Sequence, residues 1–495
     1  DYLEKNHLPK YALRYFFTKN DNSKIEDRLE YGVRDAPPVP SHQIDRGIFE
    51  NDLMDIAREA GIHIVPGKVL DVDLIEEDLH HVSFDQEGET KIVKSKWAVD
   101  ATGRASLLKR KLNLSKPIGH DINAVWFRVN SKLDMDDWPA PDEWKSFLKK
   151  DVRRLGTVHL MGTGYWVWLI PLASGITSVG IVADPRYHEF SEIDTMEKSF
   201  NWLKKNEPQF YDILQEKKDL LLDFAKIKSY SCDCKQFFSP DRWGIVGEAG
   251  AFLDPFYSPG TDFIAMNNTW TTDLISRDLK GEDIFTRAHV YNIVSTQVFK
   301  NWIPVYQDVY SLFGHAQIMI LKITWDFVTY WGMPCILFVS NGFINLETLK
   351  RIFMSEGGVG IELGKLNSWV QELYLDWAGR ENAEVVNEFC DPADLSFIRK
   401  LLIGIERKYD SVDEVVQQIN DNYVLMKDIA AQQFRVVSAR LNDTPDDMPV
   451  LFPDMKLNMS KDELVSLSEN ENAIPVCKDI EIEMRKLWRF TPVEV

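Results

Sequence analysis

Three short segments rich in small residues constrain what this chain can fold into, because each follows a predicted strand or opens a predicted helix. Residues 97–104 (WAVDATGR) read as a strand that ends in an Ala-Thr-Gly turn, where Gly103 lets the backbone approach a ligand closely. Residues 247–250 (GEAG) follow a short apolar strand, and residues 258–262 (SPGTD) open a predicted helix. Free amides at a helix start suit an anion or a polarised ring. The order of the three segments predicts a flavin-binding protein with a two-dinucleotide-binding fold.

The apolar periodicity of the remaining sequence indicates a mixed α/β (α+β) chain whose carboxyl-terminal part is mostly helical. Glycine-containing turns divide its middle into short strands, which predicts an antiparallel meander. The predicted elements are a helix over 45–61, a strand, turn and strand over 62–74, one strand over 91–104, three strands over 155–183, a polar helical stretch over 191–230, a helix over 261–280 and further helices over most of 282–495, with a surface loop after Asp443.

Composition excludes several classes of protein. The chain of 495 residues has 57 Lys and Arg and 77 Asp and Glu, so its net charge of −20 argues against binding to nucleic acid or anionic lipid. Five scattered cysteines (232, 234, 335, 390 and 477) indicate free thiols in a reducing compartment, which predicts a cytoplasmic protein. Residues 327–346 carry no formal charge, but Gly, Pro and Asn interrupt them, which favours a buried or interfacial helical hairpin over a membrane span. No metal-site or P-loop motif is present.

Two motifs carry a resemblance to a known family. Residues 166–171 (WVWLIP) match the pattern W-x-W-x-I-P, and residues 252–260 (FLDPFYSPG) match F-x-x-P-x-x-S-x-G. The first motif alone would be typical of a core strand with two aromatic residues on one face. Together with the Ala-Thr-Gly turn, the two motifs make residues 1–280 resemble the flavin-dependent halogenases.

The resemblance implies a reaction and an organisation. Reduced FAD, supplied by a separate flavin reductase, would react with O₂ and a halide ion to give hypohalous acid, which a lysine offers to an electron-rich ring. Residues 1–290 would form the FAD-binding core with an antiparallel substrate-side sheet, and residues 291–495 a helical cover on the substrate side. The family's catalytic lysine corresponds to Lys10, in an apolar stretch that lowers a lysine pKa, with Lys5 as the alternative.

The resemblance also implies roles for other residues. Trp166 and Trp168 would keep the organic substrate away from the flavin, and the halide would bind at Ser258, Gly260 and Thr261. The residues implied to contact the cofactor are Arg46, Asp100, Thr102, Gly103, Gly247, Glu248, Pro255, Gly260 and Thr261.

The chain departs from the family pattern at two places. It has no G-x-G-x-x-G segment and begins with Asp1, so we expect that this sequence is incomplete at its amino terminus. Glu248 stands where the family has aspartate. A class-A flavin monooxygenase, an isoprenoid-type reductase and a non-catalytic flavoprotein remnant remain alternatives.

The acceptor can be narrowed by the residue before the S-x-G turn. Halogenases of free tryptophan have a glutamate in that loop, where this chain has Tyr257. We therefore expect a phenolic or pyrrolic acceptor, either free or tethered to a carrier protein, with a free phenol first because the chain is acidic. Aromatic residues of the helical region could wall the substrate cavity or form helix-packing core: Trp302, Tyr306, Trp325, Tyr330, Trp331, Trp369, Tyr374 and Trp377.

Overall fold

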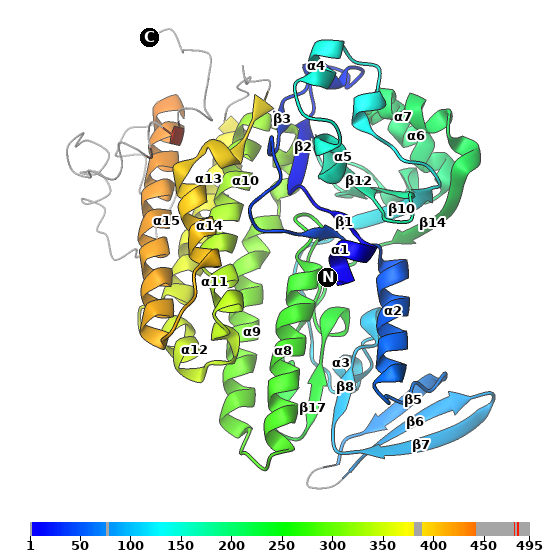
Figure 1. The fold of residues 1–495 in the computed structure, drawn as a ribbon, viewed down its shortest axis with the longest axis vertical. Helices are drawn as coiled ribbons and strands as arrows, with labels where there is room; N and C mark the ends of the chain where they lie inside the picture. The colour runs from blue at the N-terminus through cyan, green and yellow to red at the C-terminus, as the bar shows by residue number, and fades with distance from the viewer. Residues whose placement is uncertain (1, 76–78, 381–388, 442–479, 481–482, 485–495) are drawn as a thin grey trace.

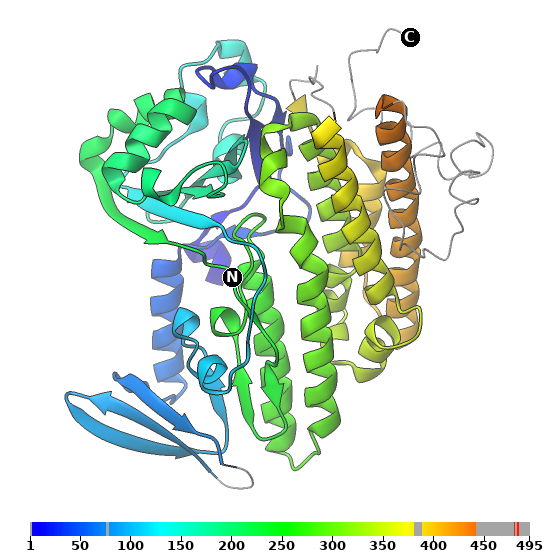
Figure 2. The same cartoon turned by 180° about the vertical axis from the view of Figure 1, so that it is seen from behind.

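The computed structural model describes residues 2–75, 79–380, 389–441, 480 and 483–484 of the chain. Figure 1 shows three parts: a larger sheet at the top with short helices around it, smaller sheets at the bottom beside helix α2, and a bundle of long helices along one side. Figure 2, from behind, shows the bundle running past both sheet parts.

The larger sheet has eight strands in the order β14-β10-β13-β12-β11-β2-β3-β18. The meander predicted over 155–183 is confirmed, with Trp166 opposite Met161 and Val182. β2 pairs with β11 and β18 pairs with β3, both in parallel, so segments from distant parts of the chain complete one sheet. The strands are β2 (Leu13–Phe17), β3 (Glu30–Tyr31), β10 (Asn123–Val129), β11 (Thr157–Gly162), β12 (Tyr165–Pro171), β13 (Thr177–Ala183), β14 (Leu221–Ile227) and β18 (Phe389–Cys390).

Side chains of this sheet alternate between two cores. Phe16 and Val167 pack toward α6 (Met196–Asn206) and α7 (Pro208–Gln215), whereas Trp166 and its neighbours pack toward the helical bundle. The prediction of helix throughout 191–230 is wrong at β14, which forms because it pairs with β10 along the edge of the sheet. Two short helices, α4 (Asp142–Ser146) and α5 (Val152–Leu155), complete this part.

The smaller sheets follow the sequence prediction in part. The helix predicted over 45–61 is confirmed as α2 (Arg46–Glu59). The first strand predicted in 62–74 is wrong, because residues 62–65 have no strand partner among the described residues. The strand predicted over 91–104 is two strands, β7 and β8, which belong to different sheets. One sheet contains β5 (Lys68–Asp73), β6 (His80–Gln86) and β7 (Glu89–Ser95), and the other β16 (Phe238–Ser239), β17 (Trp243–Ile245) and β8 (Ala98–Asp100).

The bundle begins with α8, which confirms the helix predicted over 261–280. Within the apolar segment 327–346, α10 ends at Gly332 and α11 starts at Pro334, with only Met333 between them, so the predicted hairpin is not formed by these two helices. None of the described helices combines the length and the apolar character that a membrane crossing needs. The loop predicted after Asp443 falls largely outside the described residues. The helices are α8 (Gly260–Asp278), α9 (Phe285–Tyr306), α10 (Ala316–Gly332), α11 (Pro334–Val339), α12 (Leu346–Phe353), α13 (Val359–Arg380), α14 (Ser396–Glu406) and α15 (Val412–Leu441).

Candidate active site

Two of the predicted turns lie at the carboxyl ends of parallel strands, where ligands of such sheets bind. Thr102 and Gly103 follow β8, and Gly247 and Glu248 follow β17, its parallel neighbour. The two turns are in contact, and an added Cβ on Gly247 would lie 3.4 Å from Ile264 of α8. The structure therefore brings together the three segments that the sequence assigns to one site.

Asp100 holds the first turn through hydrogen bonds within the chain. Its Oδ1 accepts from the amide and hydroxyl of Thr102 at 2.9 Å and 2.6 Å, and its Oδ2 accepts from the Leu108 amide at 2.7 Å. The carboxylate is only 4% exposed. Asp100 therefore shapes the turn, and the surface available to a cofactor there is the backbone around Gly103.

The surface at these turns fits part of an FAD site. Gly103 has φ of 58° and open space where a Cβ would stand, so its backbone is accessible. Glu248 supplies a half-buried carboxylate at the adjoining turn. Gly260 and Thr261, the first two residues of α8, have amides without an acceptor inside the helix. A pyrophosphate-binding G-x-G-x-x-G sequence is not among the residues of this chain.

The loop that joins the second turn to α8 has an uncommon backbone. Tyr257 and Ser258 have φ of 69° and 62°, a region that residues other than glycine seldom adopt. The Tyr257 hydroxyl donates to Asp326 Oδ2 of α10 at 2.8 Å. Such strained positions gather at binding sites when their surroundings hold them, and here α10 holds the S-x-G turn. Pro255, in the same loop, is half-buried.

A cavity of about 770 Å³ lies on the other side of this loop. Lys10, Ser258 and Thr261 line it, so the predicted lysine and two residues of the predicted halide-binding turn share one open-sided cavity. Lys10 lies between β1 (Leu8–Pro9) and β2, where its amide donates to the Ser41 carbonyl at 2.8 Å. A site of this size holds a drug-sized ligand.

The aromatic residues of the bundle divide into two groups. Trp302, Tyr306, Tyr330 and Trp331 line the cavity. Trp325, Trp369, Tyr374 and Trp377 are buried in the helix core instead. Four of the eight residues thus line a cavity and the other four belong to the helix-packing core; that the cavity binds substrate stays a prediction.

Lys10 and Asp262 influence each other across this cavity. Burial lowers the pKa of Lys10 to about 8, although the nearby Asp262 carboxylate opposes that shift. Burial raises the pKa of Asp262 to about 6, against a hydrogen bond from Tyr330 and the charge of Lys10. The Tyr330 hydroxyl donates to Asp262 Oδ1 at 3.2 Å. A lysine and a carboxylate shifted toward neutrality in one cavity are the properties of proton-transfer groups.

A buried ion pair lies beneath Tyr257. Lys322 Nζ is 2.6 Å from Asp326 Oδ2, one helical turn away on α10, and the two side chains are 0% and 4% exposed. Lys322 also donates to the Val305 carbonyl, and Gln371 donates to Asp326 Oδ1, each at 2.8 Å. Burial lowers the pKa of Lys322, and Asp326 opposes this. With every oxygen of Asp326 bonded, the pair supports the loop.

Trp166 and Trp168 lie behind the loop and do not line the cavity. The Trp166 indole is 2% exposed, its ring centroid is 5.4 Å from that of Phe256, and its Nε1 donates to the Tyr310 hydroxyl at 3.1 Å. Tyr310 in turn donates to Asp254 Oδ2 at 2.8 Å. Trp168 Nε1 donates to Ser178 Oγ at 3.2 Å. The two sequence motifs are thus joined through Tyr310 and Asp254.

Two other predicted or alternative residues lie elsewhere. Arg46, at the start of α2, is 79% exposed and pairs with Glu50 at 2.6 Å, so the structure does not bring it to the cavity. Lys5 lies on the exposed surface of α1 (Tyr2–Asn6). Among the two lysines considered from sequence, only Lys10 lines the cavity.

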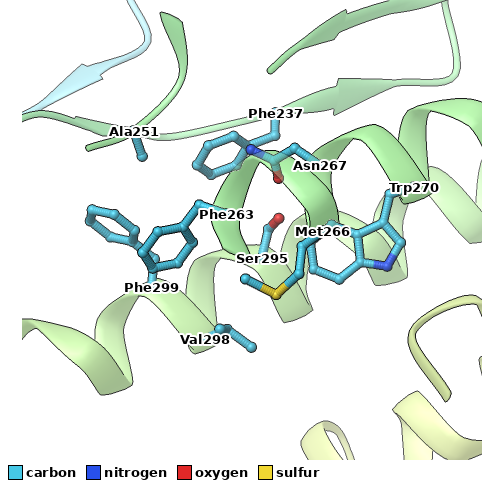
Figure 3. A pocket seen from close by; sticks show the side chains of 9 residues that line it. All are labelled: Phe237, Ala251, Phe263, Met266, Asn267, Trp270, Ser295, Val298 and Phe299. Atoms are coloured by element: carbon cyan, nitrogen blue, oxygen red, sulfur yellow. The ribbon is translucent and has the colours of Figure 1, made fainter. Parts of the chain in front are cut away.

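A second, much smaller cavity lies between α8 and α9 (Figure 3). Its volume is about 10 Å³, close to what one water molecule needs. Phe263, Met266, Trp270 and Phe299 surround it with apolar surface. It is a packing gap of the core.

Sequence reasoning missed Asp262 and the Lys322–Asp326 pair, and it considered Tyr330 only for the cavity wall. Asp262 follows directly after the recognised turn, so a carboxylate in the first turn of a helix was the available signal. Lys322, Asp326 and Tyr330 recur every four residues, which places them on one face of an otherwise apolar helix. That spacing was visible, but nothing in the sequence placed the face against the turn.

The comparisons with known proteins agree on one family. No protein-family model matches the chain. It is 27% identical over 360 residues to "Flavin-dependent halogenase chlA" of Dictyostelium discoideum, which covers 67% of this chain and 58% of that protein. It is 28% identical over 229 residues to the 1H-pyrrole-2-carbonyl-(peptidyl-carrier protein) chlorinase of Pseudomonas fluorescens. This alignment covers 46% of this chain and 48% of that protein.

Among solved structures, the halogenase PltM has a similar fold. The TM-score is 0.58, with 14% identity, over 85% of this chain and 80% of that one. This likeness confirms the predicted mixed α/β fold class. The chain spans about half to three fifths of the length of the first curated relatives.

Proposed function

Since the chain is a homologue of the flavin-dependent halogenases, we propose that it chlorinates or brominates an electron-rich aromatic compound in the cytoplasm. The reaction requires FAD, reduced by a separate flavin reductase, together with O₂ and a halide ion. The observation that carries the proposal is Lys10 in a cavity whose wall includes Ser258 and Thr261.

The chain's own residues would divide the work between the two sides of the 257–262 loop. Bound reduced FAD would activate O₂, and O₂ supplies the oxidising equivalents that convert halide to hypohalous acid. Gly103, Gly247, Glu248 and the start of α8 would hold the cofactor, and the free amides of Gly260 and Thr261 would hold the halide beside it. Lys10 would receive hypohalous acid in the cavity, by a hydrogen bond or as a haloamine. Trp166 and Phe256 seal the loop between the two sides.

The size and lining of the cavity limit which aromatic compounds fit as the acceptor. A space of about 770 Å³ walled by Trp302, Phe327 and Trp331 suits a substrate much larger than a simple phenol. We keep the phenolic or pyrrolic class, because Tyr257 stands before the S-x-G turn. A relative named for a carrier-bound pyrrole makes a tethered acceptor the second choice.

Changing the start of α8 should weaken the use of halide. Thr261→Leu, with or without Gly260→Ala, places bulk beside the two free amides. Because this weakens the anion site, the halide concentration for half-maximal rate should rise about tenfold or more. Bromide titrations at fixed FAD measure this. An unchanged halide dependence with weaker FAD binding would instead assign the turn to the cofactor alone.

The function is tested by mass spectrometry of an aromatic panel incubated with the protein, FAD, a flavin reductase, NADH and bromide. We expect a brominated phenol or pyrrole with more than one ring. Hydroxylated product without halogen would favour the monooxygenase alternative. Single-position bromination of free tryptophan, with phenols untouched, would contradict the acceptor class.

A further inference from the structure

The large cavity contains more carboxylates than a mostly apolar substrate needs. Asp35, Asp262, Asp326, Asp391 and Asp394 all line it. If an aromatic compound binds there, each carboxylate either has its charge compensated by a protein group or can accept a proton from the compound. The partners of each carboxylate decide between the two.

Asp35, Asp391 and Asp394 each have a cation of the protein within 4 Å. Asp35 pairs with Lys149, and Asp394 pairs with Arg34 at 2.8 Å. Asp391 is 3.5 Å from Arg34, and its oxygens accept from the Arg34 and Ala393 amides. A fourth, Asp326, is saturated by Lys322, Tyr257 and Gln371.

Asp262 differs from all four. Among the described residues, no cation lies within ion-pair distance of it, and the charge that acts on it most directly is Lys10. Tyr330 fixes Oδ1, and Oδ2 has no hydrogen-bond donor in the part of the chain that the structure describes. The carboxylate therefore presents one oriented, unbonded oxygen to the same space as the lysine.

We propose that Asp262 is the catalytic base that accepts the proton released by the aromatic ring when the carbon–halogen bond forms. The inference rests on the proposed halogenation. It assigns this task to a residue after the S-x-G turn, since the position directly before the turn is Tyr257 and not a carboxylate.

The step balances with hypohalous acid held by the Lys10 ammonium group. The carbon–halogen bond forms as the halogen–oxygen bond breaks, and the electron pair leaves with the oxygen, which takes a proton from Lys10 and departs as water. The ring carbon then loses its proton to Asp262 Oδ2, and the C–H electron pair restores the aromatic ring. The halogen is reduced and the ring oxidised. Proton return from Asp262 to the Lys10 amine restores both groups.

The surroundings of the two groups support this cycle. His159 of β11 faces Lys10, and burial lowers the pKa of His159 to about 3, so it stays neutral. Tyr306, Tyr330 and Cys335 face Asp262, and burial raises the pKa of each. Lys10 and Asp262 are thus the groups of this cluster that titrate near neutrality. The reaction needs Asp262 ionised and Lys10 protonated, so its rate should rise with pH through about 6 and fall through about 8.

The test compares Asp262→Asn with wild type on a ring-deuterated substrate found in the aromatic panel. Asn keeps the acceptor for Tyr330 but cannot take a proton. We expect product formation to slow about 10²-fold, a primary deuterium isotope effect that wild type lacks, and loss of the rising limb near pH 6. Hypohalous acid captured by a small thioether should be unchanged. Asp262→Glu, which retains a carboxylate, should recover part of the rate.

The matched control is Asp413→Asn, which removes a carboxylate that is 86% exposed and lies outside the cavity lining, and which should leave rate and isotope effect unchanged. If Asp262→Asn folds poorly, Tyr330→Phe removes the bond that orients the carboxylate and should produce the isotope effect. An active wild type with an equally fast Asp262→Asn, or a slow variant without an isotope effect, would overturn the inference. A wild type that forms no halogenated product would refute the proposed function instead.

Discussion

Lys10→Ala should abolish halogenation, with a fall in rate of about 10³-fold or more, because no other lysine lines the cavity of the described structure. Oxidation of reduced flavin by O₂ should continue, since in the proposed mechanism the lysine acts after hypohalous acid forms. Lys10→Arg should fail as well, because a guanidinium does not release a proton at neutral pH. Product yield by mass spectrometry, measured beside O₂ consumption, separates the two steps.

Lys5→Ala provides the matched control for this prediction. Lys5 lies five residues earlier in the chain, on an exposed helix, and its loss should leave the rate unchanged. Halogenated product at the wild-type rate from Lys10→Ala would remove the lysine from the mechanism. A loss of activity in both variants would indicate damage to the amino-terminal segment.

Glu30→Ala should cost about 3–5 kcal/mol of the free energy of unfolding. Glu30 is 2% exposed and lies between Arg14 and Arg153, both 0% exposed; it accepts from Arg14 Nη1, and the Arg153 Nε is 3.1 Å from its Oε2. Without it, two guanidinium groups remain buried beside each other with too little compensating charge. Arg153 keeps Asp136 at 2.9 Å, whereas Arg14 keeps only the Val33 carbonyl.

Urea titration followed by tryptophan fluorescence measures this loss. Asp35→Ala is the control, because its ion pair with Lys149 joins side chains that are 68% and 78% exposed and should contribute less than about 1 kcal/mol. A Glu30→Ala variant that loses no more stability than Asp35→Ala would show that the buried arginines find other partners. Since Arg14 lies on β2, four residues after Lys10, we also expect Glu30→Ala to reduce activity.

Parts of the fold were predictable where local pattern and tertiary partner agree. The meander over β11–β13 was predicted because alternating side chains and glycine turns are local signals. β14 was not, because it is an edge strand with several exposed positions and depends on β10. Residues 62–65 show the reverse case, since their strand-like sequence finds no neighbouring strand in the described structure and forms none.

The candidate site divides in the same way. The segments near residues 100, 247 and 260 could be predicted because turns that approach a cofactor need small residues. The partnership of Lys10 with Asp262, and the support of Tyr257 by Lys322 and Asp326, could not. Each joins elements that are distant in the sequence, and their closeness follows from the packing of α8 and α10 against the amino-terminal strands.

Because separate segments of the chain form the cavity wall, acceptor specificity depends on all of them together. Residues 10–42 supply one side, the 257–262 loop the floor, and α9 to α14 the remainder, with β18 inserted beside β3. We retain the division near residue 290 as a proposal, but a chimera joined there exchanges half of a binding surface. Recombination between relatives at this point should therefore change which acceptors are used, while residues 1–290, which we propose to generate the halogenating species, stay unchanged. Grafts that carry residues 10–42 together with the helices should preserve a parent's acceptor, and grafts of the helices alone should not.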